Sequence, residues 1–310
     1  MSSLVEVSPK VSEALAAGAP VVALESTIIS HGLPRPGNLA AAHDFEAILS
    51  SQGVTPATIA LIDGVPKVGL GARDLERIAT DESAAKVSNR DIGIAMARKV
   101  TGGTTVAATS VLAARAGIRV FATGGLGGVH RGAAESFDES ADLTVLSRTP
   151  ITVVSAGVKA ILDIPATLER LETLSVAVVG YRTSRFPAFW LSDSGCDLDW
   201  RVDSPEEIAD IMAVRTALGE PSALLVANPL APADQLDPEM LRGALAEALA
   251  GAARLDIRGK AVTPFLLDRI QQVTGGASVA VNLTIARGNV SLAGQIARAW
   301  AERAAEPVGG

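Results

Sequence analysis

The feature that most constrains this chain is a regular alternation of short apolar runs with longer segments of helical periodicity. Apolar runs bounded by turn residues are typical of buried strands. These runs are Pro20–Leu24, Ala57–Asp63, Lys67–Leu70, Ala84–Ser88, Ile118–Ala122, Ile151–Ser155, Val176–Val179 and Ser222–Val226. The segments with a helical pattern are Val11–Ala17, Asn38–Ser50, Arg90–Val100, Thr104–Ala116, Pro205–Leu218, Pro238–Ala253, Thr263–Val273 and Ala280–Ala305. The alternation predicts an α/β fold, layered as α/β/α, with a mostly parallel central sheet between helices.

The composition indicates one domain. The chain has 310 residues, of which 48% are hydrophobic and only 3% aromatic, so its core must consist mainly of aliphatic side chains. No linker, repeat or compositional break divides it, and we expect residues 1–310 to form a single α/β/α domain. The segment Phe186–Pro205 is richer in polar and aromatic residues. It is interpreted as a flap, an excursion from the sheet or a subunit contact.

Charge and cysteine content exclude several classes of protein. The net charge is −7 and no stretch gathers Lys and Arg into a basic face, which argues against binding of a nucleic acid polymer but allows a small anionic ligand. The single cysteine, Cys196, cannot form an intrachain disulfide and is interpreted as a structural or surface thiol. A chain without a signal pattern or a membrane-spanning run is expected to be soluble and cytoplasmic.

Two glycine motifs suggest a phosphate site. Gly102-Gly103-Thr104-Thr105 is expected to lead into a helix whose first N–H groups bind a phosphate, although a tight turn has the same sequence. The segment Thr123–Gly132 holds five glycines directly after an expected strand. Such density implies unusual backbone angles or the close approach of a ligand, with a flexible surface loop as the alternative. Within this loop, His130 and Arg131 are possible donors to a phosphate or a sugar oxygen.

Acidic and basic residues complete the pattern. The acidic segment Phe137–Asp142 suggests a hard cation or acid–base chemistry, although such clusters also occur on solvated surfaces. Lys159 follows an apolar strand in a turn of small residues, and Lys86 has a similar apolar neighbourhood. Desolvation lowers the pKa of a lysine and yields a neutral amine that attacks carbonyls to form Schiff bases. The alternative for each is an ordinary solvated lysine.

Several long motifs in fixed order resemble one family. The run Val22–Gly32, which reads VALESTIISHG, and the two glycine motifs are similar to those of the pseudouridine-5′-phosphate glycosidase family, which includes a protein first named for indigoidine biosynthesis. Further matching motifs are Val202–Glu207, Ala227–Pro229 and Thr263–Leu267. The likeness extends from about Pro20 to the last expected helix.

The resemblance implies an activity and a set of site residues. The reaction is the reversible conversion of pseudouridine 5′-phosphate to uracil and ribose 5-phosphate, a C-glycosidase reaction that convention places among the carbon–oxygen lyases. The resemblance implies Glu25 as the proton donor and Lys159 as the nucleophile that forms a Schiff base with ring-opened ribose. It implies Asp138 as the ligand of a divalent cation, Mn or alternatively Mg. The residues implied to contact the substrate are Lys86, Val106, Thr123, His130, Ser140, Ala141, Asp142 and Asn282. A homotrimeric catalytic domain is also implied.

Two other functions fit the same residues. An aldolase-like Schiff-base lyase acting on another phosphosugar would share the lysine and the phosphate loops. A non-catalytic sensor of phosphoribosyl compounds would bind without turnover, but the simultaneous presence of Glu25, Lys86 and Lys159 argues against it.

Overall fold

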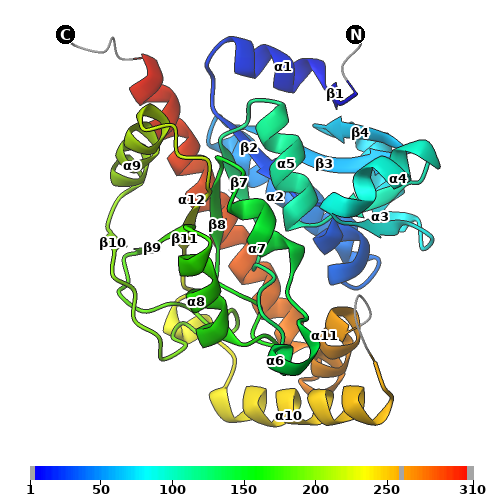
Figure 1. Cartoon of the computed structure of the whole chain (residues 1–310). Helices are drawn as coiled ribbons and strands as arrows, with labels where there is room; N and C mark the ends of the chain where they lie inside the picture. The colour runs from blue at the N-terminus through cyan, green and yellow to red at the C-terminus, as the bar shows by residue number, and fades with distance from the viewer. Residues whose placement is uncertain (1–3, 258–261, 306–310) are drawn as a thin grey trace.

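The computed structural model describes residues 4–257 and 262–305 of the chain. A central sheet runs through this part of the molecule, with strand order β1-β4-β3-β2-β7-β8-β11-β9-β10 and with β5 and β6 attached beside β3 (Figure 1). The strands are β1 Glu6–Val7, β2 Val21–Leu24, β3 Thr55–Ile62, β4 Val65–Val68, β5 Ala85–Val87, β6 Gly102–Thr104, β7 Val120–Ala122, β8 Thr152–Ser155, β9 Ala177–Tyr181, β10 Arg201–Val202 and β11 Leu224–Ala227. Only the β3–β4 and β3–β6 pairs are antiparallel among the strands described.

Helices cover both faces of this sheet. They are α1 Pro9–Ala16, α2 Gly37–Ser51, α3 Ala72–Thr80, α4 Ile92–Ala97, α5 Val106–Arg115, α6 Ala133–Ser136, α7 Ala141–Leu146, α8 Ile164–Thr173, α9 Pro205–Ala217, α10 Pro238–Arg254, α11 Val262–Val273 and α12 Ala277–Ala305. The short helical turns are η1 Ile28–Gly32, η2 Asn89–Asp91 and η3 Pro232–Asp234. The predicted fold class, a layered α/β/α protein with a mostly parallel sheet, is confirmed. No helix within the described ranges is both long and apolar enough to cross a membrane.

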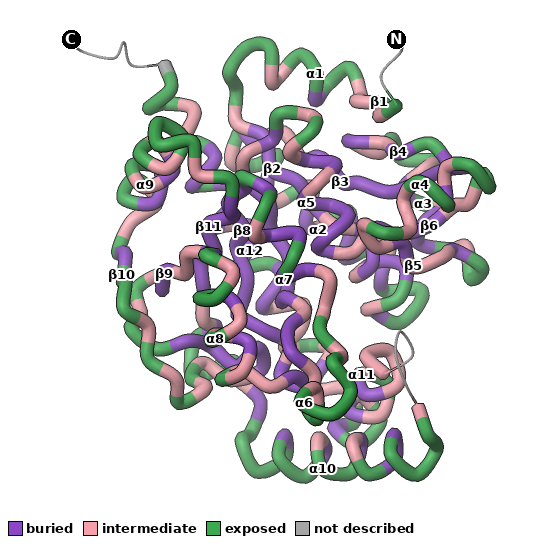
Figure 2. The backbone as a smooth tube through the Cα atoms, viewed as in Figure 1, coloured by how far each residue is buried: buried purple, intermediate pink, exposed green. Residues whose placement is uncertain are grey.

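The core follows from the period of two along each strand. In β2, Val21 and Ala23 belong to a cluster with α1, α5 and α7, whereas Val22 and Leu24 belong to a cluster with α2, α9 and α12. Because successive side chains of a strand point to opposite faces, a strand that is apolar throughout is buried by helices on both sides. Figure 2 shows the central strands buried and the outward sides of the helices exposed.

Some local predictions were wrong. Gly102 and Gly103 lie on a strand, β6, which pairs with both β3 and β5, and the expected helix follows it as α5, which begins at Val106. A Cβ atom at Gly103 would lie 2.3 Å from the Ser30 hydroxyl, so the glycine permits close packing of β6 against η1. The helix expected over Arg90–Val100 is instead η2 followed by the short α4. Strands β1 and β10 and helices α3 and α8 were not predicted.

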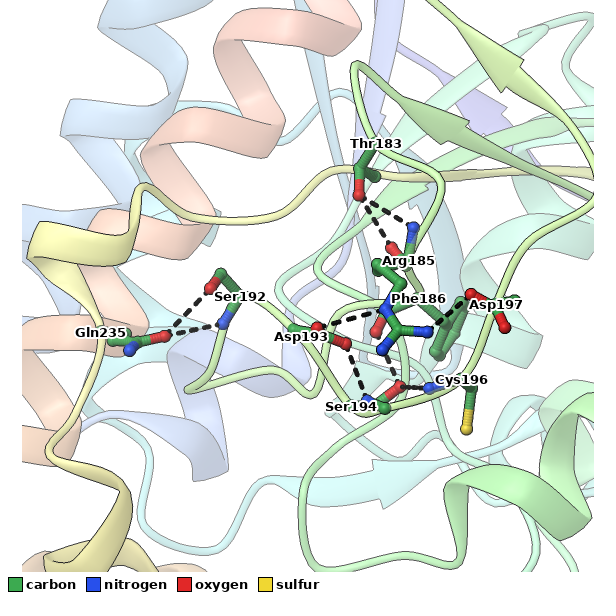
Figure 3. A network of polar contacts seen from close by, with 10 residues as sticks. Thr183, Arg185, Phe186, Ser192, Asp193, Ser194, Cys196, Asp197 and Gln235 are labelled. Carbon is green, nitrogen blue, oxygen red and sulfur yellow. Dashed lines mark hydrogen bonds and ion pairs between the residues drawn. The ribbon is translucent and has the colours of Figure 1, made fainter.

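The segment between β9 and β10 is an excursion from the sheet with a buried inner half. Phe186 and Trp190 are each 1% exposed and pack in a cluster with α10 and α11. The outer half is held by polar contacts, in which the Arg185 guanidinium binds the carboxylates of Asp193, at 3.3 Å, and Asp197, at 2.6 Å (Figure 3). The inner half is therefore part of the core rather than a separate flap.

Candidate functional site

A cavity of about 410 Å³ opens where strands β2, β7 and β8 end. The strand register explains why these ends meet, because Leu24 pairs with Ala122 and Ala122 pairs with Val154. The residues that follow are therefore level at the carboxyl edge of the sheet, where open α/β sheets place ligands. The cavity is lined by these residues of the predicted site: Glu25, Lys86, Val106, His130, Asp138, Ser140, Ala141, Asp142, Lys159 and Asn282. The other predicted residue, Thr123, lies behind Glu25.

Two threonine hydroxyls hold the carboxyl group of Glu25. Thr123, which follows β7, contacts Oε1, and Thr27, at the start of η1, contacts Oε2. Thr123 and Glu25 are 98 residues apart in the chain and meet only because β2 and β7 are neighbours. Among the described residues, hydroxyl groups thereby fix the carboxyl group at the cavity wall.

The backbone around Lys159 is fixed by the glycine-rich loop. The N–H of Lys159 donates to the carbonyl of Leu126 at 3.0 Å, and the N–H of Leu126 donates to the carbonyl of Gly157 at 2.9 Å. Gly157 has φ +77°, and a Cβ atom there would lie 2.4 Å from the backbone carbonyl oxygen of Pro187. This position needs glycine on both counts, and its conformation turns the chain so that Lys159 lines the cavity.

The density of glycine after β7 has a different cause from the predicted one. Gly125, Gly127 and Gly128 do not have positive φ angles. Each lies against a neighbouring side chain, so that a Cβ atom would come within 2.2 to 2.6 Å of it. The neighbours are the Phe189 ring, the Ser140 hydroxyl and the Thr167 hydroxyl, respectively. Close packing within the protein thus requires three of the five glycines, and Gly132, with φ +78°, has the unusual backbone angle that was expected.

Asp142 occupies the helix start that was expected to bind a phosphate. Its Oδ1 accepts from the N–H of Ala107 in the first turn of α5, at 3.0 Å, and its Oδ2 accepts from the N–H of Gly127, at 2.8 Å. Thr105 caps the same helix by accepting from the N–H of Ala108, at 3.4 Å. Asp142 is 6% exposed, so its carboxylate joins α5 to the glycine-rich loop as a buried anion. Two of the first N–H groups of α5 are therefore already satisfied within the protein, and phosphate binding at this helix start stays a prediction.

Lys86 brings a second basic group to the cavity. Lys86 is on β5, paired in register with Gly103 of β6, and is half-buried. Ser88 and Arg90 follow it and also line the cavity. The Arg90 side chain is 73% exposed and lies 3.6 Å from the carboxylate of Asp91. Lys86, Ser88 and Arg90 bring two positive charges and a hydroxyl to one end of the cavity, which suits a phosphate.

The pKa of His130 depends on both lysines of the cavity. Burial of the imidazole lowers the pKa of His130 below its ordinary value of 6.5, although the Asp138 carboxylate, 4.0 Å away, acts in the opposite direction. The positive charges of Lys86 and Lys159 lower the pKa of His130 further. The ring is therefore neutral over a wider pH range than a solvated histidine.

The carboxylates that line the cavity differ in their hydrogen-bond and ion-pair partners. Glu139 forms an ion pair with Arg170 at 2.9 Å, and Asp142 is bound to backbone N–H groups. Asp138 is a carboxylate of the cavity whose side chain is 37% exposed. Within the described ranges, no group of three or more His, Cys, Asp or Glu residues is arranged to hold a metal ion. A cation at Asp138 would therefore take most of its ligands from water, as Mg²⁺ commonly does.

The apolar end of the cavity combines a planar ring with an oriented amide. Phe189 lines the cavity, and its neighbour Trp190 donates its indole N–H to Oδ1 of Asn282 at 2.5 Å. An indole nitrogen can only donate, so the carboxamide oxygen faces Trp190 and its NH₂ group is available to a ligand. Sequence reasoning did not assign Phe189, Thr27, Ser88 or Arg90 to the site. Only Thr27, within the matched run after β2, carried a local signal.

Residues 10–299 match the family described as indigoidine synthase A like protein. The chain is 60% identical to a protein named pseudouridine-5′-phosphate glycosidase from Frankia alni, over 98% of this chain and 84% of that protein. It is 58% identical to a protein of the same name from Saccharopolyspora erythraea, over 96% of this chain and 99% of that protein.

Solved structures show the same fold. A prealnumycin C-glycosynthase in complex with ribulose 5-phosphate superposes with a TM-score of 0.91 at 36% identity, over 99% of this chain and 100% of the other. An indigoidine synthase A-like protein from Thermotoga maritima gives a TM-score of 0.87 at 35% identity, over 96% of this chain and 97% of the other.

Proposed function

This chain belongs to the indigoidine synthase A-like family, and we propose that it is a pseudouridine-5′-phosphate glycosidase. It cleaves the carbon–carbon glycosidic bond of pseudouridine 5′-phosphate reversibly to uracil and ribose 5-phosphate. The observation that carries this proposal is the relation to proteins of that name at 58% and 60% identity over nearly the whole chain. The cavity that joins Glu25, Lys86 and Lys159 supports it.

The chemistry of a C-glycoside explains why a lysine and an acid are needed together. A carbon-linked base is a poor leaving group, so simple hydrolysis is slow. In our proposal the Nζ atom of Lys159 bonds to the anomeric carbon as the ribose ring opens. The nitrogen lone pair then forms the C=N bond, while the electron pair of the glycosidic bond returns to uracil. The ring oxygen takes the proton that the attacking nitrogen loses as it recovers its lone pair, and the carbon of uracil takes the proton of Glu25, the proton donor. Water then hydrolyses the C=N bond, which releases ribose 5-phosphate, frees Lys159 and returns a proton to Glu25.

We place the phosphate at the basic end of the cavity. Lys86, Ser88 and Arg90 offer charge-assisted donors there, and the phosphate of the substrate anchors the reacting carbon near Lys159. The base then lies toward Phe189, whose ring suits stacking, with the Asn282 amide as a donor to a base oxygen or a sugar hydroxyl. Val106, Ser140 and Ala141 complete the wall between the two ends.

The residues present fit a divalent cation at Asp138. Carboxylate oxygen favours Mn²⁺ or Mg²⁺, and we propose that Asp138 is the protein ligand. When bound, such an ion supplies positive charge that orders water and polarises nearby oxygen atoms. His130, whose Nδ1 lies 4.0 Å from the Asp138 carboxylate, and Ser140 line the same cavity.

We further propose that residues 1–310 act as one catalytic domain, that the enzyme is a homotrimer and that it works in the cytoplasm. The continuous sheet of the described residues supports the first point. Sedimentation analysis is the direct test of the trimer.

The defining experiment is incubation with pseudouridine 5′-phosphate and detection of free uracil. Unphosphorylated pseudouridine is the matched control, and we expect a large loss of catalytic efficiency with it because the phosphate anchor is missing. Borohydride reduction with ribose 5-phosphate should trap a stable adduct if the Schiff base forms. Binding of substrate without release of uracil would favour the sensor, and turnover of other phosphosugars alone would favour the aldolase-like lyase.

A second candidate is C-glycoside synthesis on another aromatic acceptor. The structural likeness to a prealnumycin C-glycosynthase favours it, because that protein has the same fold and was solved with a sugar phosphate. Incubation of ribose 5-phosphate with uracil or with larger aromatic acceptors separates the two functions. The higher identity to proteins named glycosidases makes uracil the expected acceptor.

A further inference from the structure

We propose that Thr27 is a positioning residue that serves both protonation states of Glu25. Its hydroxyl accepts a hydrogen bond from the acid form of Glu25 and, after the proton has gone to the substrate, donates one to the carboxylate. The inference rests on Glu25 being the proton donor of the proposed function.

The number of hydrogens available to the oxygen–oxygen contacts around Glu25 supports this proposal. Thr27 Oγ1 contacts Glu25 Oε2 and also lies 2.8 Å from the carbonyl oxygen of Thr104. Thr123 Oγ1 contacts Glu25 Oε1. These are three oxygen–oxygen contacts, and each needs a hydrogen. The two hydroxyls supply one hydrogen each and the carbonyl supplies none, so the set is complete only when Glu25 carries its own proton.

When Glu25 is protonated, the three hydrogen bonds have one arrangement of donors and acceptors. Thr123 donates to Oε1, the acid hydrogen on Oε2 is donated to Thr27, and Thr27 donates to the Thr104 carbonyl. Within the described residues, the Thr123 hydroxyl pairs with Glu25 alone and so donates to Oε1, which places the acid hydrogen on Oε2. The hydroxyl of Thr27 therefore decides which oxygen of Glu25 carries the proton.

A buried cluster of hydroxyl groups keeps the Thr104 carbonyl in place. Thr104 is fully buried, and its N–H donates to Ser26 Oγ at 2.9 Å. The hydroxyls of Ser26 and Thr104 both donate to the carbonyl of Ile59 in β3, each at 2.6 Å. Thr109, also fully buried, contacts Thr104 Oγ1 at 2.9 Å. Because these buried hydroxyl groups are hydrogen-bonded to one another and to the backbone, they hold the Thr104 carbonyl in place as an acceptor for Thr27.

The proton transfer balances without any further group. The O–H bond on Oε2 breaks, its hydrogen bonds to the substrate atom, and the electron pair remains on the carboxylate. The Thr27 hydroxyl then turns from the Thr104 carbonyl to Oε2, so that the ionised Glu25 accepts from both threonines. A charge-assisted hydrogen bond is thus formed only after the proton has left, which favours the transfer.

Other charged and titratable groups face this cavity, and the test must separate them from Glu25. They are His31, Lys86, Arg90, His130, Asp138, Glu139, Asp142 and Lys159. All variants compared below keep these groups unchanged, so that differences between variants report on the threonines.

The experiment compares Thr27→Val, Thr27→Ser and Thr123→Val. We expect Thr27→Val to lower kcat about 10- to 100-fold with little change in KM, because a hydrogen bond to the reacting carboxyl is lost. Thr27→Ser keeps the hydroxyl and should stay within about threefold of the wild type. Thr123→Val removes a donor that serves mainly the carboxylate, so the alkaline limb of its pH–rate profile should move to higher pH. Thr27→Val should move that limb less, because its hydroxyl serves both forms.

Infrared difference spectroscopy tests the inference without turnover. The wild type minus Glu25→Gln should show a protonated carboxyl band within the pH range of activity, and the band should shift in Thr27→Val but not in Thr27→Ser. Thr27→Ala replaces Thr27→Val if the latter does not fold. Wild-type kcat in Thr27→Val, equal limb shifts in both valine variants, or the absence of a protonated band would each overturn the proposal. Failure of the wild type to release uracil would instead count against the proposed function, since the spectrum is read independently.

Discussion

The two sides of the cavity hold their lysines in different ways. Lys159 lies in a loop whose backbone is tied at Leu126 and Gly157 and pressed against the buried Phe186 segment. Lys86 lies on a three-residue strand that pairs only with β6 among the described strands. The Lys159 side is thus built from the loops of central strands and the core, and the Lys86 side from a short pair attached beside the sheet.

This difference suggests a division of roles. A nucleophile needs its reacting atom held to within a fraction of an ångström, and a loop fixed at several backbone points provides that precision. A charge that binds a phosphate acts over a longer range and tolerates a less constrained support. We therefore assign bond formation to Lys159 and binding to Lys86, and four predictions follow from largest to smallest effect.

Removal of the two lysines should give unequal losses. We expect Lys159→Ala to lower uracil release by roughly four orders of magnitude or more and to abolish the borohydride adduct, because the nucleophile is gone. Lys86→Met, which keeps the length of the side chain, should lower kcat/KM by about 10- to 100-fold while still allowing an adduct. Peptide mass mapping locates the adduct. An adduct on Lys86 would reverse the two roles.

The acidic loop beside Lys159 should respond to metal. Asp138→Asn replaces a carboxylate with a weak neutral ligand, and we expect activity to fall about 10- to 100-fold and to lose its dependence on added Mn²⁺. Glu139→Gln is the matched control, because Glu139 is paired with Arg170 and should leave the metal response intact. Full activity of the wild type after exhaustive chelation would contradict the metal site.

Glycine substitutions should separate the two supports. Gly157→Ala combines a positive φ with a clash against a fixed backbone carbonyl, and we expect it to lower the free energy of unfolding by about 1–3 kcal/mol or more and to impair adduct formation. Gly103→Ala, on the Lys86 side, has no positive φ and meets the Ser30 hydroxyl at 2.3 Å but a backbone carbonyl, that of Ser26, only at 3.0 Å. It should raise KM with less loss of stability.

A third glycine controls for backbone strain alone. Gly117 has φ +89° but open space around it, so Gly117→Ala should destabilise by about 1 kcal/mol without affecting the adduct. Chemical denaturation and trapping measure the two outcomes. Equal effects of Gly157→Ala and Gly117→Ala would show that packing against Phe186 does not position Lys159.

The smallest expected effect is on the pKa of His130, which depends on the charges of both Lys86 and Lys159. Both ammonium groups lower its pKa, with Lys86 contributing more than Lys159. We therefore expect Lys86→Met to raise the pKa of His130 more than Lys159→Met does, as followed by NMR titration in metal-free buffer. The reverse order would indicate that His130 lies closer to the Lys159 side.

The same shift has a consequence for stability. Because the pKa of His130 is lower in the folded chain than its ordinary value of 6.5, the unfolded chain binds the proton first as pH falls. This histidine therefore leaves the free energy of unfolding unaffected well above pH 6.5 and decreases it as the pH drops below that value. His130→Gln should reduce the loss of stability in acid, whereas His43→Gln, on the exposed side of α2, serves as the control.

Much of the fold was readable from the chain because hydrophobic periodicity is local. The apolar runs of β2, β3, β7, β8 and β11 are buried on both faces. A strand between two layers of helices needs apolar side chains on both faces, so it is visible in the sequence as a continuous apolar run. Asp63-Gly64, between two apolar runs, is an equally local signal for the antiparallel β3–β4 hairpin. Lys86 and Lys159 were also identified from their neighbours in sequence and Glu25 from the family resemblance, and the cavity brings the three together.

The contacts that make these residues a site were decided by tertiary structure alone. Thr123 reaches Glu25 because the order of strands makes β7 the neighbour of β2, and no local pattern encodes that order. For the same reason, the sequence could not show that Asp142 fills the start of α5 or that Phe189 packs on Gly125. Residue types and periodicity determine which elements form, whereas close packing between distant elements determines which polar groups are satisfied internally and which remain for a ligand.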